Sequence, residues 1–165
     1  MSLVRFKGQN HPQQVARGGP RPEVDDRATT PEVFGPLHER FRFTVDAAAL
    51  PHNAKLPRFW TLEQDGLAQD WSGERVWCNP PYSSIEPWVA KASGAGADLV
   101  VMLLPANRTE QGWWHRHVEP RRDTPGGVRV EFLPGRMRFI KAGATEVGPN
   151  ERPPFGVCLL IWESA

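Results

Sequence analysis

Four consecutive residues, Asn79-Pro80-Pro81-Tyr82, stand where an apolar stretch ends and a helical pattern begins. Their types suit chemistry on an amine attached to an aromatic ring, such as the exocyclic nitrogen of adenine. The lone pair of that nitrogen is delocalised, so it is a poor nucleophile. Two acceptors aimed at its two N–H bonds would favour the tetrahedral nitrogen that forms as a methyl group arrives. The Asn79 side-chain oxygen and the Pro80 carbonyl can be those acceptors, and proline adds no competing donor.

The remaining residue, Tyr82, offers an aromatic face on which an extruded base can stack, as enzymes that act on bases of a duplex require. Acceptors placed where positive charge develops act as an oxyanion hole does, with the sign reversed. Taken alone, the four residues also fit a stiff turn, because Pro and Asn are common turn residues. The segment is therefore a candidate catalytic site whose context decides between these interpretations.

The elements predicted around this segment place it at the end of a central strand. Residues 75–78 (RVWC) are typical of a short apolar strand, and residues 84–91 of a helix capped by Ser83 or Ser84. Open α/β sheets hold their ligands outside the carboxyl ends of their strands. We expect residues 79–82 to lie at such an edge.

Further strands and helices alternate along the chain. Thr30 and Pro31 form a good N-cap and N1 pair for a helix that extends to Phe41. The other predicted elements are strands over 42–46, 98–104, 128–132, 136–140 and 155–162, and a helix over 109–118. This order predicts an α/β fold with a mostly parallel sheet and an antiparallel C-terminal part.

The composition is that of an ordinary globular protein. The chain has 165 residues, of which 39% are apolar and 24% charged, and a net charge of +1. That charge excludes a global basic field, so any nucleic-acid site must be a local patch. Residues 1–28 mix Pro, Gly, Gln and charge without periodicity and predict a disordered tail, which leaves one domain over 29–165.

Several classes of site are not indicated. No apolar segment follows Met1 as in a secretion signal, and no apolar run is long enough to span a bilayer, so we expect a cytoplasmic protein. His115 and His117 have no Cys or carboxylate at ligand spacing, which argues against a metal site. Walker loops, nucleophile elbows and zinc-finger spacings are absent from the sequence.

The wider pattern resembles the phage-type DNA N6-adenine methyltransferase family. The resemblance extends over roughly residues 29–162 and rests on Thr30-Pro31, Val45–Ala48, His52–Lys55, Asp65–Leu67, Trp77–Tyr82, Leu104–Thr109 and Gly135–Phe139. It implies a compact Rossmann-like core that uses S-adenosylmethionine and has no separate target-recognition domain. It also implies site-specific methylation of DNA in a bacterial host cell, by an enzyme of phage or prophage origin.

The resemblance assigns roles to individual residues. It places Thr30, Pro31 and Asp46 around the methionine and sugar portions of the cofactor and Asp65 near its adenosine, and it includes Ala47 among the cofactor-binding residues. It makes Asn79–Tyr82 the site that holds the target adenine. The sequence departs from the usual glycine-rich loop, because no glycine occurs between Asp46 and Gly66. As alternatives to these roles in cofactor binding, Asp46 could be a helix cap and Asp65 a solvated charge in a loop.

Cationic and aromatic residues are the candidates for contact with DNA. They are Arg108, Trp113, Arg116, Arg136 and Arg138. Each has a plain alternative, since adjacent tryptophans on a helix point in different directions and surface arginines are often only solvated.

Two other functions share the central motif or the fold. Enzymes that methylate a protein glutamine or a guanine amine in RNA meet the same problem of a weakly nucleophilic nitrogen. A DNA-binding remnant could keep the fold without catalysis. Intact Asn79, Tyr82, Asp46 and Asp65 argue against the remnant, and the wider resemblance favours DNA as substrate.

Overall fold

The structure, a computed structural model, describes residues 27–136, 139–141 and 155–164. The elements in these ranges are β1 (Arg27–Thr29), α3 (Pro31–Phe41), β2 (Val45–Asp46), the 3-10 helix η1 (Gly66–Ala68), β3 (Arg75–Cys78), α4 (Glu86–Gly94), β4 (Leu99–Pro105), α5 (Gly112–His117), the 3-10 helix η2 (Glu119–Arg121), β5 (Val128–Phe132), β6 (Phe139–Lys141) and β7 (Val157–Glu163). None of the helices in these ranges is both long enough and apolar enough to cross a membrane.

Five strands form the main sheet in the order β2-β3-β4-β7-β5. Strands β2, β3 and β4 are parallel, with Val76 opposite both Val45 and Val100. Strand β7 is antiparallel to both β4 and β5 and lies between them. The sheet therefore confirms the predicted α/β fold, with a parallel core and an antiparallel C-terminal part.

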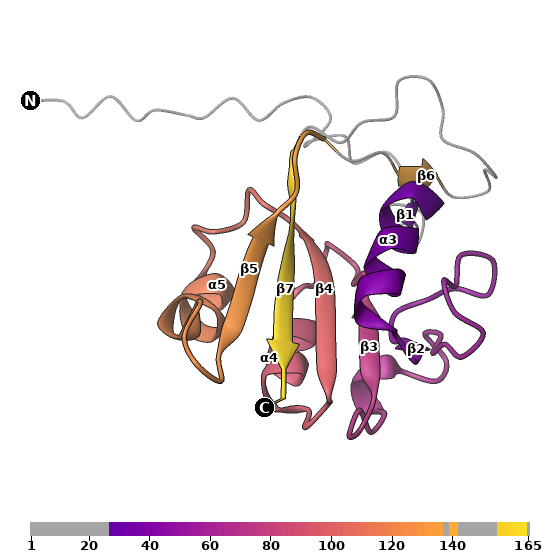
Figure 1. The fold of residues 1–165 in the computed structure, drawn as a ribbon, viewed down its shortest axis with the longest axis horizontal. Coiled ribbons are helices and arrows are strands. Elements are labelled where there is room, and N and C mark those ends of the chain that lie inside the picture. Colours follow the sequence, from indigo (N-terminus) through magenta and orange to yellow (C-terminus); the bar gives the residue numbers. More distant parts are fainter. Residues whose placement is uncertain (1–26, 137–138, 142–154, 165) are drawn as a thin grey trace, which may run out of the picture.

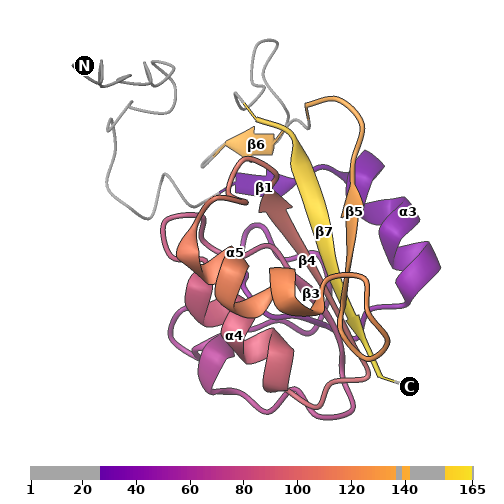
Figure 2. The same ribbon diagram turned by 90° about the vertical axis from the view of Figure 1, so that its left-hand side faces the viewer.

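The sheet is covered on both faces. Helix α3 lies on one face, and α4 and α5 lie on the other (Figures 1 and 2). Successive strand residues point to opposite faces, so β4 places Val100, Met102 and Leu104 against α4 and α5, and Val101 and Leu103 toward α3. This double coverage explains why all seven residues of β4 are buried.

The predicted elements exist, but several of their boundaries differ. Strands 75–78 and 128–132 match, whereas the strand predicted over 42–46 is reduced to Val45–Asp46. The helix predicted over 84–91 begins at Glu86, after Ile85 and not after a serine cap. The helix predicted over 109–118 is the shorter α5. Helix α3 begins at Pro31 as predicted, although the Thr30 side chain makes no cap hydrogen bond.

A second, two-stranded sheet pairs β1 with β6, antiparallel, with Thr29 opposite Phe139. It lies near the N-terminal end of α3 (Figure 1). The predicted strand 136–140 therefore contributes to this small sheet and not to the main one. Arg27 and Ala28, placed in the tail by the sequence, belong to β1, while residues 1–26 lie outside the described residues.

Candidate active site

The segment Asn79–Tyr82 follows β3 directly, at the edge where the parallel strands β2, β3 and β4 all end. The chain after β2 stays alongside it, because the Ala47 N–H donates to the Trp77 carbonyl at 2.9 Å. The predicted catalytic segment thus lies at the carboxyl edge of the sheet, where α/β folds bind ligands.

A cavity of about 310 Å³ opens beside this segment. Its walls are Ala47–Leu50, Asn53, Trp60–Leu62, Asp65, Gly66, Asn79, Pro81, Ser83 and Trp88. Most of these side chains are apolar, and the carboxylate of Asp65 and the amides of Asn53 and Asn79 are the chief exceptions. An apolar chamber with a few polar groups is typical of a site for a small organic molecule.

The cavity depends on a close approach of two backbone segments at Gly66. A Cβ on this residue would lie well inside contact distance of the Ala47 carbonyl oxygen and 3.2 Å from the Trp88 ring. The Gly66 carbonyl also accepts a hydrogen bond of 2.8 Å from the buried indole of Trp71. The sequence has no glycine directly after Asp46 that would allow a close backbone approach. Gly66 allows this approach instead, from the opposite side of the contact with Ala47.

Asp65 lines this cavity and is the N-cap residue of η1. Its carboxylate accepts from the Leu67 N–H at 3.1 Å, and its backbone is left-handed with φ 51°. The side chain is exposed. Asp65 is thus both a local cap and a carboxylate on the cavity wall, which joins the two interpretations of this residue.

Asp46, at the end of β2, is almost fully buried at 3% exposure. Its carboxylate accepts from the Lys55 N–H at 3.0 Å and the Ala48 N–H at 3.4 Å, so it holds the loop after β2. Burial raises the pKa of this carboxyl, against the opposing effect of those hydrogen bonds and of the Lys55 charge. Asp46 lines a second, small cavity of about 30 Å³, together with Ala28, Thr29, Ala48, Asn53, Lys55, Trp77 and Asn79.

Asn79 lines both cavities. Its Nδ2 donates to the hydroxyl of Thr29 at 3.4 Å, so the same amide can present its carbonyl oxygen as an acceptor. Pro80 is buried and Pro81 lines the larger cavity. The two prolines hold Asn79 and Tyr82 in fixed relation to the strand end.

Tyr82 is tethered at its hydroxyl and contacted at its ring. The hydroxyl donates to the Leu103 carbonyl of β4 at 3.2 Å. Phe139 and Phe155 both meet the ring edge-on, with centroids 6.3 Å away. A tyrosine fixed in this way is pre-organised as a surface for another flat ring.

Some predicted cofactor residues lie elsewhere in the described structure. Ala47 and Asp65 line the larger cavity and Asp46 the smaller one, whereas Thr30 and Pro31 line neither. Thr30 is buried at the start of α3, where its carbonyl accepts from the Val33 and Phe34 N–H groups. Its observed contacts are those of a helix start.

Trp113, predicted as a contact with DNA, is buried in the structure. Its ring is 6% exposed, packs against Trp114 with centroids 5.9 Å apart, and belongs to the core under α5. Its indole N–H donates to Gln111 at 2.7 Å. With its ring inside the core, Trp113 stabilises the packing of α5 on the sheet.

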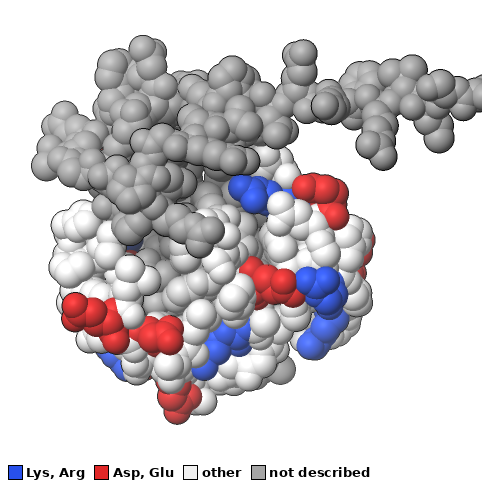
Figure 3. Space-filling view, turned by 180° about the vertical axis from the view of Figure 1, so that it is seen from behind, with Lys and Arg blue, Asp and Glu red and all other residues white. Residues whose placement is uncertain are grey.

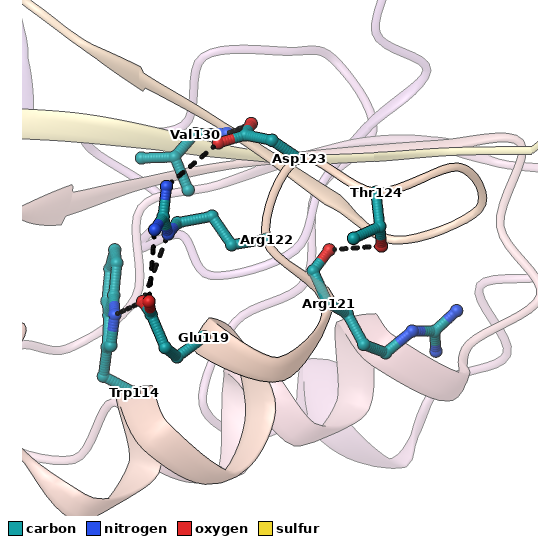
Figure 4. A network of polar contacts seen from close by, with 7 residues as sticks. All are labelled: Trp114, Glu119, Arg121, Arg122, Asp123, Thr124 and Val130. Carbon is teal, nitrogen blue, oxygen red and sulfur yellow. Dashed lines mark hydrogen bonds and ion pairs between the residues drawn. The ribbon is translucent and has the colours of Figure 1, made fainter.

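The neighbouring basic residues lie in an ordered network (Figure 4). Glu119 accepts from the Trp114 indole at 3.0 Å and from two nitrogens of Arg122 at 3.1 Å. Asp123 accepts from the Val130 N–H at 3.1 Å. Arg122 is thereby committed to local ion pairs at the edge of the sheet opposite Asn79.

The candidate arginines differ in their surroundings. Arg116 is 59% exposed but forms an ion pair of 2.6 Å with Glu86, while Arg108 is half-buried and Arg136 exposed. Arg138 lies outside the described residues. On the face in Figure 3, basic and acidic side chains of the described residues alternate. This surface agrees with the net charge of +1 in excluding a broad basic field there.

Among the described residues, no cluster of His, Cys, Asp and Glu could hold a metal ion. Sequence reasoning missed several wall residues of the larger cavity, chiefly Trp60 and Trp88. Trp60 belongs to a stretch that pairs with the end of β2, where Ala49 N–H donates to the Trp60 carbonyl at 3.0 Å. The chain has seven tryptophans, but their number does not indicate which of them line a cavity.

Comparison with known proteins identifies the family. The profile of the family described as DNA N-6-adenine-methyltransferase (Dam) matches residues 19–165. A DNA N-6-adenine-methyltransferase of Haemophilus phage HP1 is 42% identical over 116 residues, which cover 68% of this chain and 64% of that protein. Another, of Escherichia phage T1, is 33% identical over 109 residues, or 64% of this chain and 42% of that protein. The match thus spans less than two thirds of either relative.

A solved structure from Pyrococcus horikoshii, described as that of an RNA methyltransferase, aligns with a TM-score of 0.40 and 16% identity. The alignment covers 66% of this chain and 50% of that one. Likeness at this level carries no argument. The family profile matches most of the chain, including both cavities and the Asn79–Tyr82 segment. The chain belongs to the DNA N-6-adenine-methyltransferase (Dam) family.

Proposed function

We propose that this protein transfers a methyl group from S-adenosylmethionine to the exocyclic amine of an adenine extruded from DNA, at a specific sequence. The observation that carries the proposal is the position of Asn79–Tyr82, at the carboxyl edge of β3 and beside a cavity of about 310 Å³. Family membership supports the choice of DNA adenine as substrate. The expected location is the cytoplasm of a bacterial host.

The larger cavity fits the cofactor in size and in chemistry. Its apolar walls, chiefly Trp60, Leu62 and Trp88, suit a flat purine, and the Asp65 carboxylate suits a ribose hydroxyl or an adenine amine. A sulfonium cofactor has no pyrophosphate, so the backbone nest of a glycine-rich loop is unnecessary. When bound, the cofactor supplies an electrophilic methyl group.

The residues of the chain prepare the amine that receives this group. The Asn79 side-chain oxygen and the Pro80 carbonyl accept hydrogen bonds from the two N–H groups of this amine. These hydrogen bonds favour the tetrahedral nitrogen as its positive charge develops. The base stacks on Tyr82, whose ring is held by the hydrogen bond to Leu103 and by two phenylalanine contacts. Because these groups are fixed before the substrate arrives, little reorganisation is needed at the moment of transfer.

The test is to incubate the protein with unmethylated DNA and the cofactor, digest the DNA to nucleosides, and measure N6-methyladenine by mass spectrometry. Asn79→Ala should abolish turnover, since it removes an acceptor that strengthens in the transition state. Tyr82→Ala should lose stacking of about 1–3 kcal/mol per base, while Tyr82→Phe, the matched control, keeps the ring. Cofactor affinity, measured by calorimetry, should stay near the parental value in both tyrosine variants.

Three outcomes would contradict the proposal. A parent that binds DNA and the cofactor but makes no methyladenine is a silent remnant. A parent that methylates only a protein glutamine or a guanine amine in RNA has the alternative substrate. Parental turnover in Asn79→Ala would remove Asn79 from the site.

A further inference from the structure

The small sheet of β1 and β6 contacts both ends of the Asn79–Tyr82 segment. Thr29 on β1 accepts a hydrogen bond from Asn79 Nδ2 at 3.4 Å. Phe139 on β6 lies edge-on to the Tyr82 ring, with centroids 6.3 Å apart. Thr29 and Phe139 are themselves directly opposite each other in the strand pairing. One cross-strand pair therefore touches the first and the last residue of the candidate catalytic segment.

Thr29 is almost completely removed from water, at 1% exposure of the residue. A buried hydroxyl without a partner destabilises the folded state, so the Thr29 hydroxyl needs the contact that it makes with Asn79. Thr29 also lines the small polar cavity that contains the Asp46 carboxylate and the Asn79 amide. Its place is fixed by strand pairing, since Ala28 is opposite Ile140 and Thr29 opposite Phe139.

The orientation of the Asn79 amide decides what this residue can do. A carboxamide accepts through its oxygen and donates through its nitrogen. An amide turned by half a rotation would direct its NH₂ toward the substrate amine, where two donors meet and no hydrogen bond forms. A contact that holds Nδ2 on the Thr29 side therefore presents the oxygen on the other.

We propose that Thr29 is a positioning residue that orients the Asn79 amide, and that the Thr29–Phe139 pair fixes Asn79 and Tyr82 relative to each other. The proposal rests on the function proposed above. In this proposal the β1–β6 sheet, which lies outside the main sheet, helps to orient the side-chain oxygen of Asn79 toward the substrate amine. The proposal also predicts that the loss appears in turnover and not in cofactor binding, because neither Thr29 nor Phe139 lines the larger cavity.

The experiment compares Thr29→Val with Thr29→Ser. Valine keeps the branched shape but lacks the hydroxyl, whereas serine keeps the hydroxyl. Thr29→Val should lower kcat about tenfold, the effect of one lost hydrogen bond of about 1.4 kcal/mol, with little change in KM for DNA. Affinity for S-adenosylhomocysteine should be parental, and Thr29→Ser should restore most of kcat. Thr124→Val, which removes a hydroxyl bonded to the Arg121 carbonyl at the opposite edge of the sheet, is the matched control and should keep parental kcat.

The parent is measured first, so that the two proposals fail separately. A parent without methyl transfer overturns the proposed function. An active parent with parental kcat in Thr29→Val overturns only the positioning role, as does a Thr29→Ser variant no better than Thr29→Val. If Thr29→Val does not fold, Thr29→Ala, which is smaller than the native side chain, replaces it with the same expected and contradicting results.

Discussion

Gly66→Ala tests the close approach on which the larger cavity depends. The added Cβ would overlap the Ala47 carbonyl oxygen, which is backbone and cannot rotate away, and would press on the Trp88 ring at 3.2 Å. Overpacking of this kind costs about 1–3 kcal/mol, against a gain of about 0.4–1 kcal/mol that Gly→Ala brings by restricting the unfolded chain. We expect a net loss of about 1–2 kcal/mol, or a roughly five- to thirtyfold larger unfolded fraction.

The same change should weaken ligand binding, because both sides of the approach line the cavity. Separation of Ala47 from Gly66 would widen the cavity and lower the affinity for S-adenosylhomocysteine by about tenfold, equivalent to about 1.4 kcal/mol. Urea unfolding and calorimetry measure the two effects. Gly94→Ala is the matched control, since Gly94 is exposed in α4, where an added Cβ would meet open space, and it should gain up to about 1 kcal/mol. Parental stability and affinity in Gly66→Ala would refute the close approach.

Three further predictions concern charges. Asp65→Asn removes the negative charge but keeps an oxygen for the Leu67 N–H, and asparagine tolerates the left-handed backbone. We expect the affinity for S-adenosylhomocysteine, measured by calorimetry, to fall about tenfold, or about 1.4 kcal/mol, because the charge is lost. Parental affinity would show that the acidic contact to the cofactor lies elsewhere. Burial raises the pKa of Asp46, so between the unfolded and the folded pKa the folded state holds a proton that the unfolded state has released. The free energy of unfolding should therefore fall as pH rises through this range. Asp46→Asn should lose this pH dependence in urea unfolding, and an unchanged dependence would show that Asp46 does not cause it. Binding to duplex DNA should weaken with salt, with a slope of log affinity against log salt of about −0.9 per phosphate neutralised. The double variant Arg108→Gln with Arg136→Gln should flatten this slope, whereas the control Arg129→Gln should not. Equal slopes in the parent, the double variant and the control would contradict DNA contacts by Arg108 and Arg136.

The sequence predicted the elements better than their partners. The strand 75–78 was predicted correctly, because a short apolar run that ends at Asn-Pro-Pro is informative locally. The pairing of β6 with β1 was not predicted. Nothing in the local sequence distinguishes a strand of the main sheet from one whose partner lies 110 positions away, as Phe139 does from Thr29. Long-range pairing is set by the whole fold.

The site shows the same division. Four residues predicted for the site, Ala47, Asp65, Asn79 and Pro81, line the larger cavity, and each was singled out because its type carries the chemistry or matches the family pattern. Trp60 and Trp88 were missed because an aromatic residue in a loop or helix is equally suited to core and to cavity wall. The burial of Trp113 was not predicted for the same reason, since it depends on how α5 packs on the sheet. Type alone does not determine which side of a helix faces inward.

The position of β7 affects how the chain can fold. Strand β4 emerges from synthesis long before Val157–Glu163, yet its hydrogen bonds on that side are made with β7. Strand β5 likewise has β7 as its partner in the main sheet. Until β7 inserts, the apolar strand β4 and the amphipathic strand β5 present open edges that could pair with other chains. The step that closes the sheet is therefore late and non-local, and a chain interrupted before residue 157 would leave β4 exposed to aggregation.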